Sequence, residues 1–392
     1  MMEFLIDFCP YVIAALVLFV LGFNLSRREN RLRESTHEAV SLPWYSWEAI
    51  ASILLIALFS ALRYYTGNDY RMYLTNFQQL QADGSLLRGN LEIGFVLVTK
   101  LIALTGCHFS FYFGFWGALQ AFCLYYGLRH HKQLYCWIGL VLLLGPFCIN
   151  WLTYLRQWTI AIAFVPMVPY FARRKFWPCL LFTLVAVTIH YSAWILMLLY
   201  FVPLVLKADR SRNFYLAIFA VCYLLGTYPV WLSPIASSRW LFSLVGYDKY
   251  QCLFQPLIEE HFVFKGYGPL RLIYLFQSLL FIWYYPAMRE YYSRDKLFNA
   301  FFTLAFVGVC YQHLFINTVY ALIRPADYLF IFVVIMMAYV FDYFMAIKKK
   351  FMLCVSCFVI CSFTFISCYK EVYFLCKPAA ECNLLYHFIP QL

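Results

Sequence analysis

Long apolar segments alternate with short polar segments along almost the whole chain. Each apolar segment approaches the roughly 20 residues that a transmembrane helix needs to cross the hydrocarbon core. This pattern predicts an all-α, polytopic integral membrane protein. The thirteen apolar segments are 9–25, 47–64, 91–106, 109–128, 134–150, 156–172, 176–189, 191–206, 213–229, 269–288, 297–316, 328–347 and 351–368.

Six basic clusters lie between these segments and predict the topology. Lys and Arg accumulate in short cytoplasmic loops, so an even number of crossings is expected between successive clusters. Three apolar segments separate the first two clusters, and one of them therefore does not cross. The clusters are Arg27/Arg28/Arg31/Arg33, Arg129/His130/His131/Lys132, Arg173/Arg174/Lys175, Lys207/Arg210/Arg212, Arg289/Arg294/Lys296 and Lys348/Lys349/Lys350.

The segment that does not cross is predicted to be 91–106. It is short and carries Lys100 near its centre, where a lipid-facing charge would cost several kcal/mol. We therefore expect about twelve transmembrane helices, plus a re-entrant or surface helix at about 91–106, with both termini outside. The run 176–206 is too long for one span and is predicted to turn at His190, near the outer surface.

Composition supports this interpretation. Hydrophobic residues make up 64% of the 392 residues and charged residues only 12%, which excludes a soluble domain and a disordered chain. The net charge of +11 lies mostly in the loop clusters, so it indicates topology and not nucleic-acid binding. We expect a single membrane-embedded domain over 1–392, with membrane lipid around it and a large aromatic-rich outer loop at about 230–268.

A set of polar residues remains on the predicted outer face after topology is accounted for. An ionisable group at membrane depth is costly unless it faces a cavity or a partner, so this set marks a candidate site. Arginines suit a phosphate ligand because a guanidinium stays charged and binds phosphate through two hydrogen bonds, although snorkelling near a helix end is the alternative. The set comprises Arg63, Asp69, Arg71, Glu92, Lys100, Arg156, Gln157, His190, Ser192, Arg239 and Arg324.

Five short motifs fall on these same residues. The most specific is Arg63 followed by Gly67-Asn68-Asp69-Tyr70 and Met72-Tyr73. The other four, in chain order, are Glu92-Ile93-Gly94-Phe95, Arg156-Gln157 followed by Ala161, His190-Tyr191-Ser192-Ala193, and Arg324 followed by Tyr328. In order and spacing, over about 47–330, they resemble the motifs of the EpsG family, a branch of the Wzy-like polymerases of bacterial surface polysaccharides.

The resemblance implies a glycosyltransferase of the bacterial inner membrane, with its active site facing the periplasm or the outside. Its substrates would be undecaprenyl-pyrophosphate-linked oligosaccharides, one as donor and one as acceptor, for O-antigen, capsule or exopolysaccharide synthesis. A GT-C-like architecture and a chain-length regulator as partner are further expectations from this resemblance. We expect no cofactor and no metal, since no paired acidic motif of the kind that holds a divalent ion on a sugar nucleotide is seen.

Roles follow for the individual residues. Arg156 and Arg324 would hold the donor pyrophosphate, with Arg63 assisting. His190 is a candidate base because its ordinary pKa near 6.5 suits proton transfer at neutral pH, while helix capping is its alternative role. Asp69 and Glu92 are alternative bases, or else they orient an arginine or a sugar hydroxyl. The supporting residues would be Gln157, Ser192, Tyr70, Gly67 and Tyr328.

Three further interpretations stay open. The tyrosines of the first motif, including Tyr70 and Tyr73, favour an interfacial aromatic belt over sugar stacking. A flippase or transporter of the lipid-linked oligosaccharide is an alternative function, although no half-to-half repeat is evident. An O-antigen-ligase-type transferase is another, because a ligase would use arginines in the same way.

Overall fold

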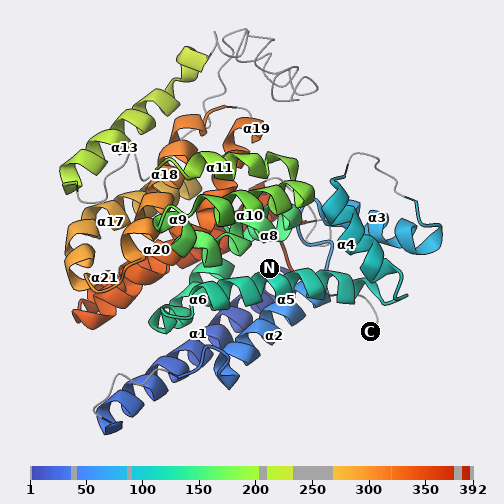
Figure 1. Cartoon of the computed structure of the whole chain (residues 1–392), viewed down its shortest axis with the longest axis horizontal. Coiled ribbons are helices and arrows are strands. Elements are labelled where there is room, and N and C mark those ends of the chain that lie inside the picture. Colours follow the sequence, from blue (N-terminus) through green and yellow to red (C-terminus); the bar gives the residue numbers. More distant parts are fainter. Residues whose placement is uncertain are drawn as a thin grey trace.

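The computed structural model describes residues 2–36, 42–85, 91–202, 210–232, 268–318, 320–374 and 382–388, and this part of the chain is almost entirely helical (Figure 1). Each predicted apolar segment contains helix. The α-helices are α1 (Met2–Thr36), α2 (Trp47–Leu62), α3 (Tyr70–Ala82), α4 (Ile93–Ala103), α5 (Phe109–Gly127), α6 (Tyr135–Leu144), α7 (Cys148–Thr153), α8 (Leu155–Ala163), α9 (Val168–Ala172), α10 (Phe176–Ile189), α11 (Ile195–Leu199), α13 (Arg212–Thr227), α17 (Pro269–Tyr291), α18 (Phe298–Phe315), α19 (Tyr320–Ile323), α20 (Asp327–Ala346) and α21 (Lys350–Tyr369).

Four of the helical stretches are long and apolar enough to cross a membrane, and several shorter apolar helices accompany them. The number of crossings stays a prediction. Residues 233–267, which form nearly all of the predicted outer loop and include Arg239, lie outside the described residues. The four long stretches are Phe4–Leu32, Phe298–Phe315, Arg324–Ala346 and Lys350–Tyr373.

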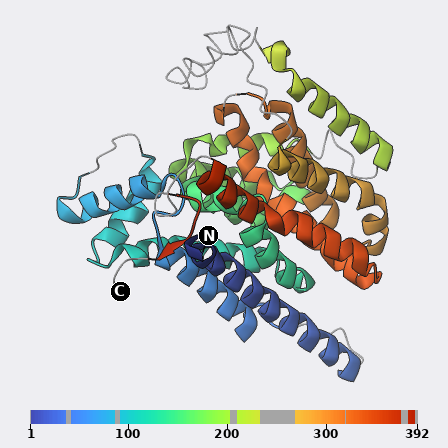
Figure 2. The same cartoon turned by 180° about the vertical axis from the view of Figure 1, so that it is seen from behind.

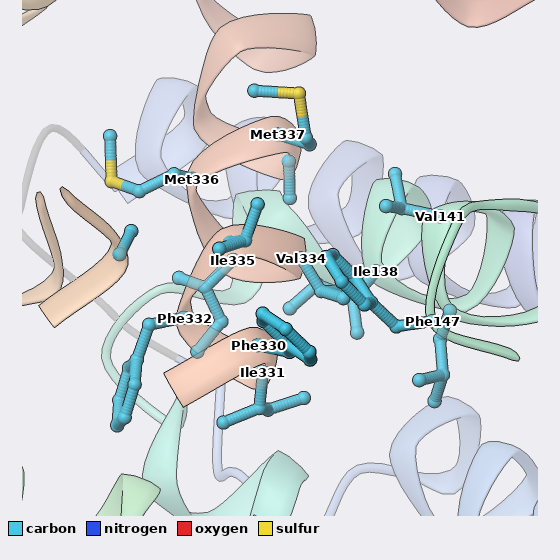
Figure 3. Close-up of a cluster of buried hydrophobic side chains, with 14 of the residues drawn as sticks. Ile138, Val141, Phe147, Phe330, Ile331, Phe332, Val334, Ile335, Met336 and Met337 are labelled. Carbon is cyan, nitrogen blue, oxygen red and sulfur yellow. The ribbon is translucent and has the colours of Figure 1, made fainter. Parts of the chain in front are cut away.

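Helix α20 is the centre of the bundle. It contacts α6, α8, α17, α18 and α21. Of its most apolar 18 residues, 83% are buried inside the protein, against 33% of the corresponding residues in α1 and in α21. An uninterrupted run of branched, aromatic and Met side chains gives this helix no polar face. Figure 3 shows Val334 beside Ile138 of α6, and Phe332 and Met336 on the other side of α20. Phe330 stacks on Phe147 at a centroid distance of 4.4 Å.

Proline and glycine divide two of the predicted segments into shorter pieces. Helix α6 ends before Gly145 and Pro146, and α7 begins at Cys148. The segment 156–172 becomes α8, a 3₁₀ turn and α9, because Pro166 and Pro169 supply no backbone N–H to continue the helical ladder. The break between α8 and α9 lies between Arg156, in the first turn of α8, and the basic cluster Arg173/Arg174/Lys175 that follows α9.

Helix α4 covers 11 residues of the segment 91–106, and its failure to cross the membrane stays a prediction. Its 11 residues extend about 16 Å, roughly half of a 30 Å hydrocarbon core. Ile93, Leu97 and Leu101 form an exposed apolar stripe, and Lys100 is also exposed. This face suits a helix that lies at the edge of the bilayer, next to α3 and α10 (Figure 1).

Helices α3 and α4 form a second hydrophobic cluster with α5. Tyr70 is fully buried and stacks on Phe113 at a centroid distance of 4.3 Å, while Tyr73 is 3% exposed and packs on Phe95. The interpretation of Tyr70 and Tyr73 as an interfacial belt is therefore wrong. Aromatic positions three and four residues apart on α3 bury one face of the helix instead.

A two-stranded antiparallel sheet joins distant parts of the chain at one end of the bundle. Strand β1 (Arg63–Tyr64) follows α2 and pairs with β2 (His387–Phe388), as Figure 2 shows near the two termini. The Tyr386 amide donates to the Asp7 carbonyl of α1 at 3.2 Å, and the Gly67 amide donates to the Asn383 carbonyl at 2.7 Å. The start of α1, the first motif and residues 382–388 therefore lie together.

Candidate functional site

Glu92 is the acceptor at which three segments meet. It precedes α4 with extended backbone, and its carboxylate accepts hydrogen bonds from three donors. The donors are the Arg156 guanidinium of α8, His190 Nδ1 at 2.9 Å and the Tyr191 amide at 3.0 Å. The Glu92, Arg156 and His190 side chains keep between 16 and 18% exposure, so the cluster is enclosed but still accessible.

The local backbone explains why Glu92 can reach these donors. Helix α4 packs against α10, and a Cβ at Gly94 would collide with the Thr188 hydroxyl of α10. Glycine at this position therefore allows the start of α4 to approach the end of α10 closely. That approach brings the carboxylate of Glu92 next to the residue that ends α10, His190.

The donors around Glu92 keep it ionised. Burial alone would raise the pKa of this carboxyl, but the His190 hydrogen bond and the Arg156 charge lower it from 4.5 to about 2. Burial lowers the pKa of His190 below 6.5, the hydrogen bond that His190 donates to Glu92 opposes this effect, and the charges of Arg156 and Arg324 reinforce it. At neutral pH the arrangement is an anionic Glu92 beside a neutral imidazole.

His190 occupies the break between α10 and the 3₁₀ turn η3 (Tyr191–Trp194). Its backbone is extended, with φ −151° and ψ 118°, and its side chain caps neither helix. A neutral His190 that donates from Nδ1 to Glu92 leaves Nε2 with a lone pair. Nε2 makes no hydrogen bond within the described residues.

Arg156 and Arg324 lie close to His190 from two other segments. The Arg156 guanidinium packs 5.5 Å from the Phe95 ring and lies within hydrogen-bonding reach of the Tyr73 hydroxyl. Arg324 begins the 3₁₀ turn η6 (Arg324–Ala326), and its guanidinium lies 5.3 Å from the Tyr154 ring. Arg156 and His190 contact the same Glu92 carboxylate, and Gln157, next to Arg156, donates to the Arg324 carbonyl.

Two hydrogen bonds fix the segments that carry these groups. Gln157, 3% exposed, donates from Nε2 to the Arg324 carbonyl at 2.6 Å, which ties η6 to α8. The Ser192 hydroxyl lies 2.9 Å from the Tyr328 hydroxyl, which ties the turn after His190 to α20. The structure therefore brings together four of the five motifs identified in the sequence.

The first motif forms a scaffold next to this cluster. Arg63 is 2% exposed, donates to the Leu152 carbonyl at 2.6 Å and lies 5.6 Å from the Tyr70 ring, whose hydroxyl donates to the Arg63 carbonyl. These contacts favour a structural role for Arg63 over assistance to a ligand. Asp69 immediately precedes α3, and its charge acts on Tyr73, which also meets Arg156.

Gly67 has a conformation that the scaffold requires. Its φ is +97°, and an added Cβ would lie 2.7 Å from the Leu152 carbonyl oxygen, the acceptor that Arg63 also uses. A left-handed backbone and a close approach both favour glycine here. The Gly67-x-Asp69-Tyr70 motif therefore encodes a turn packed on the end of α7.

A buried pair beside Arg324 was missed by the sequence analysis. Asn150 donates to Asp327 at 3.0 Å, and Asp327 is 1% exposed at the first turn of α20. The sequence feature that could have indicated this pair is Asp327, an acidic residue at the start of an otherwise apolar span and close to Arg324. Within the described part of the chain, no three His, Cys, Asp or Glu side chains are grouped to hold a metal ion.

Comparison with known proteins gives one match. The family model described as "EpsG family" matches residues 46–379, which is most of the chain and includes all five motifs. No curated protein and no solved structure matches the chain.

Proposed function

Because the chain belongs to the EpsG family, a Wzy-like polysaccharide polymerase family, we propose that it lengthens a lipid-linked glycan by glycosyl transfer at the Glu92, Arg156, His190 and Arg324 cluster. The donor is a glycan chain on undecaprenyl pyrophosphate, and the acceptor is an incoming lipid-linked repeat unit. The reaction takes place on the extracytoplasmic face of a bacterial inner membrane. Family membership supports the polymerase class, and the site geometry supports the mechanism.

The observation that carries this proposal is the Glu92 hydrogen bond to His190. A carboxylate that accepts from Nδ1 fixes the imidazole tautomer and stabilises the imidazolium that forms when Nε2 takes a proton. In the proposed step, an acceptor hydroxyl attacks the anomeric carbon of the donor and gives its proton to His190 Nε2. The bond between that carbon and the pyrophosphate oxygen breaks, and the lipid pyrophosphate leaves.

Arg156 and Arg324 are placed to neutralise the leaving pyrophosphate. Negative charge develops on the leaving oxygen, and fixed cations in a partly enclosed site stabilise it without reorganisation. Arg324 is oriented through Gln157 and Tyr154, whereas Arg156 is held by Glu92 and Phe95. Gln157 holds the Arg324 backbone and the Tyr154 ring contacts its guanidinium, so both arginines have contacts that do not depend on the ligand.

The contacts also separate the roles of the carboxylates. Glu92 already accepts three hydrogen bonds and has a pKa of about 2, so it suits orientation of His190 and Arg156 better than proton abstraction. Asp69, at the start of α3, remains the alternative base.

The test uses purified protein in liposomes with a labelled lipid-linked repeat unit. Wild-type protein should produce a ladder of products that differ by one repeat unit. Arg156→Ala, Arg324→Ala and His190→Ala should each abolish the ladder, while Lys100→Ala, which removes an exposed charge from α4, should not. Normal ladders from both arginine variants would exclude the pyrophosphate contacts, and a normal ladder from His190→Ala would exclude the base.

The same preparation distinguishes the alternative functions. Movement of the labelled lipid between leaflets without lengthening would identify a flippase. Transfer of one finished block to a different acceptor would identify a ligase.

A further inference from the structure

A cavity of about 1010 Å³ opens at the opposite end of the bundle from Glu92 and His190. Helix α20 separates the two ends, because Tyr328 in its first turn contacts Ser192 and Ala346 in its last turn lines the cavity. Its 20 residues extend about 30 Å. Basic residues from three separate loops line this cavity, including Arg129, His131, Arg173, Lys175, Arg294 and Lys296.

The carboxylates of the cavity are already engaged. Asp295 lies 3.1 Å from His131 Nδ1 and accepts a hydrogen bond from Tyr339. Asp342 accepts a hydrogen bond from Tyr292 at 2.7 Å. Hydroxyl and imidazole donors therefore satisfy the acidic side chains from within the wall.

The permanent cations of the cavity are not neutralised by the carboxylates that the structure describes, although Arg129 donates a hydrogen bond to the Tyr126 carbonyl at 2.9 Å. Arg129, Arg173, Lys175, Arg294 and Lys296 make no ion pair with any carboxylate in the described ranges of the chain. Five positive charges around one hollow repel one another unless an anion joins them. The preference of Lys and Arg for cytoplasmic loops explains why basic loops lie at this end of the bundle. It does not explain why residues from three of these loops line the same cavity.

His131 adds a buried polar side chain to the wall. The residue is 5% exposed, and its Nε2 is buried with no hydrogen-bond partner among the described residues. A buried polar atom without a partner costs free energy unless a ligand or water satisfies it. The neighbouring His130 has a lowered pKa, because burial and the charges of Arg129, His131 and Lys132 disfavour its protonated form.

We propose that this cavity binds a phosphate-bearing ligand, at a second site distinct from the proposed reaction site. Arginine forks and lysines from three loops match the several oxygens of a diphosphate, and the volume accommodates a group of that size. The phosphate comes from a soluble compound or from an anionic lipid headgroup in the adjacent leaflet. The experiment distinguishes these two sources.

The test uses the purified full chain in nanodiscs of phosphatidylcholine only, with inorganic pyrophosphate as the probe in a calorimetric titration. The double variant Arg173→Gln/Arg294→Gln should weaken binding about tenfold or more, since it removes two charge-assisted contacts. The control Lys348→Gln/Lys350→Gln removes equal charge from exposed positions at the same end, outside the cavity lining, and should bind as wild type does. Arg129→Gln provides a second cavity variant if the double variant does not fold.

A second arm tests the lipid source. In nanodiscs that contain phosphatidylglycerol, native mass spectrometry should show this lipid retained by wild type and by the control but released by the cavity variant. Pyrophosphate binding in the first arm indicates a soluble ligand, and lipid retention in the second indicates a headgroup; either result supports the site. The proposal is overturned if wild type binds neither probe, or if the control loses binding as much as the cavity variant. Neither arm requires polymerase activity, so the outcome is independent of the proposed function.

Discussion

Glu92 at the start of α4 and His190 at the end of α10 share a hydrogen bond of 2.9 Å, although 98 positions separate them in the chain. The bond joins the short helix that is predicted not to cross the membrane to the break in a long apolar run. The short helix α4 and the helix break at His190, the two places where the regular pattern of apolar segments is interrupted, are therefore in direct contact.

Glu92→Gln should lower the polymerisation rate about 100-fold or more, within the range of general base catalysis. The rate of a base-catalysed step rises as His190 loses its proton, and Glu92 raises the pKa of His190. Removing this charge should therefore move the rising limb of the pH–rate profile to lower pH. The exposed control Glu290→Gln should leave both rate and profile unchanged, and an unshifted profile for Glu92→Gln would contradict the assigned role.

Glu92 should also make stability depend on pH. Its pKa in the folded protein is about 2, below its ordinary value of 4.5, so its contribution is fully present above pH 4.5 and is lost as the pH falls toward 2. At neutral pH, Glu92→Gln should lower the free energy of unfolding by about 1–2 kcal/mol after solvent screening. Denaturation in detergent at several pH values should show this difference shrinking below pH 4.5; a constant difference would argue against ionisation as its cause.

Gly67→Ala should destabilise the protein more than Gly84→Ala. Both glycines have positive φ, at 97° and 72°, so both substitutions introduce backbone strain of about 1 kcal/mol or more. Only at Gly67 would the new Cβ also meet the Leu152 carbonyl, because nothing lies within 4 Å at Gly84. Thermal melting of the two variants measures the difference, and equal melting temperatures would show that the turn does not pack on α7 as described.

Ser192→Ala and Tyr328→Phe should show non-additive effects. Each substitution removes the same 2.9 Å hydrogen bond, so the double variant should lose about 1 kcal/mol less stability than the sum of the single variants. A double-mutant cycle on thermal stability measures this coupling. Ser110→Ala paired with Tyr328→Phe is the matched control, since Ser110 bonds within its own turn, and that pair should be additive.

Arg63→Met should lower stability and leave the rate per folded molecule unchanged. The substitution removes the hydrogen bond to the Leu152 carbonyl and leaves that acceptor buried, a loss of about 1–3 kcal/mol. Arg71→Met, at an exposed position eight residues further on, should change neither property. A variant that melts as wild type does but turns over at least about tenfold more slowly would instead assign Arg63 to the pyrophosphate, as a lost charge-assisted contact would.

The sequence singled out polar residues that the structure brings together, but it did not predict how they pair. Helix positions followed from apolar runs, and Glu92, Arg156, His190 and Arg324 stood out because polar groups are costly in such runs. The pairing of Glu92 with His190 could not be predicted, since hydropathy carries no information about which helix ends meet. The burial of Tyr70 and Tyr73 was predictable in principle, because Leu74 and Phe77 continue the same helical stripe.

The contacts of residues 382–388 have a consequence for the order of events during synthesis. The Gly67 amide and the Thr66 hydroxyl donate to carbonyls of Asn383 and Leu385, and the Tyr386 hydroxyl donates to the Phe59 carbonyl at the end of α2. The end of α2 and the first motif emerge from the ribosome more than 300 residues before these partners exist. Most of the bundle can therefore insert and pack before these contacts form, and the scaffold beside His190 closes only after residues 382–388 have been synthesised.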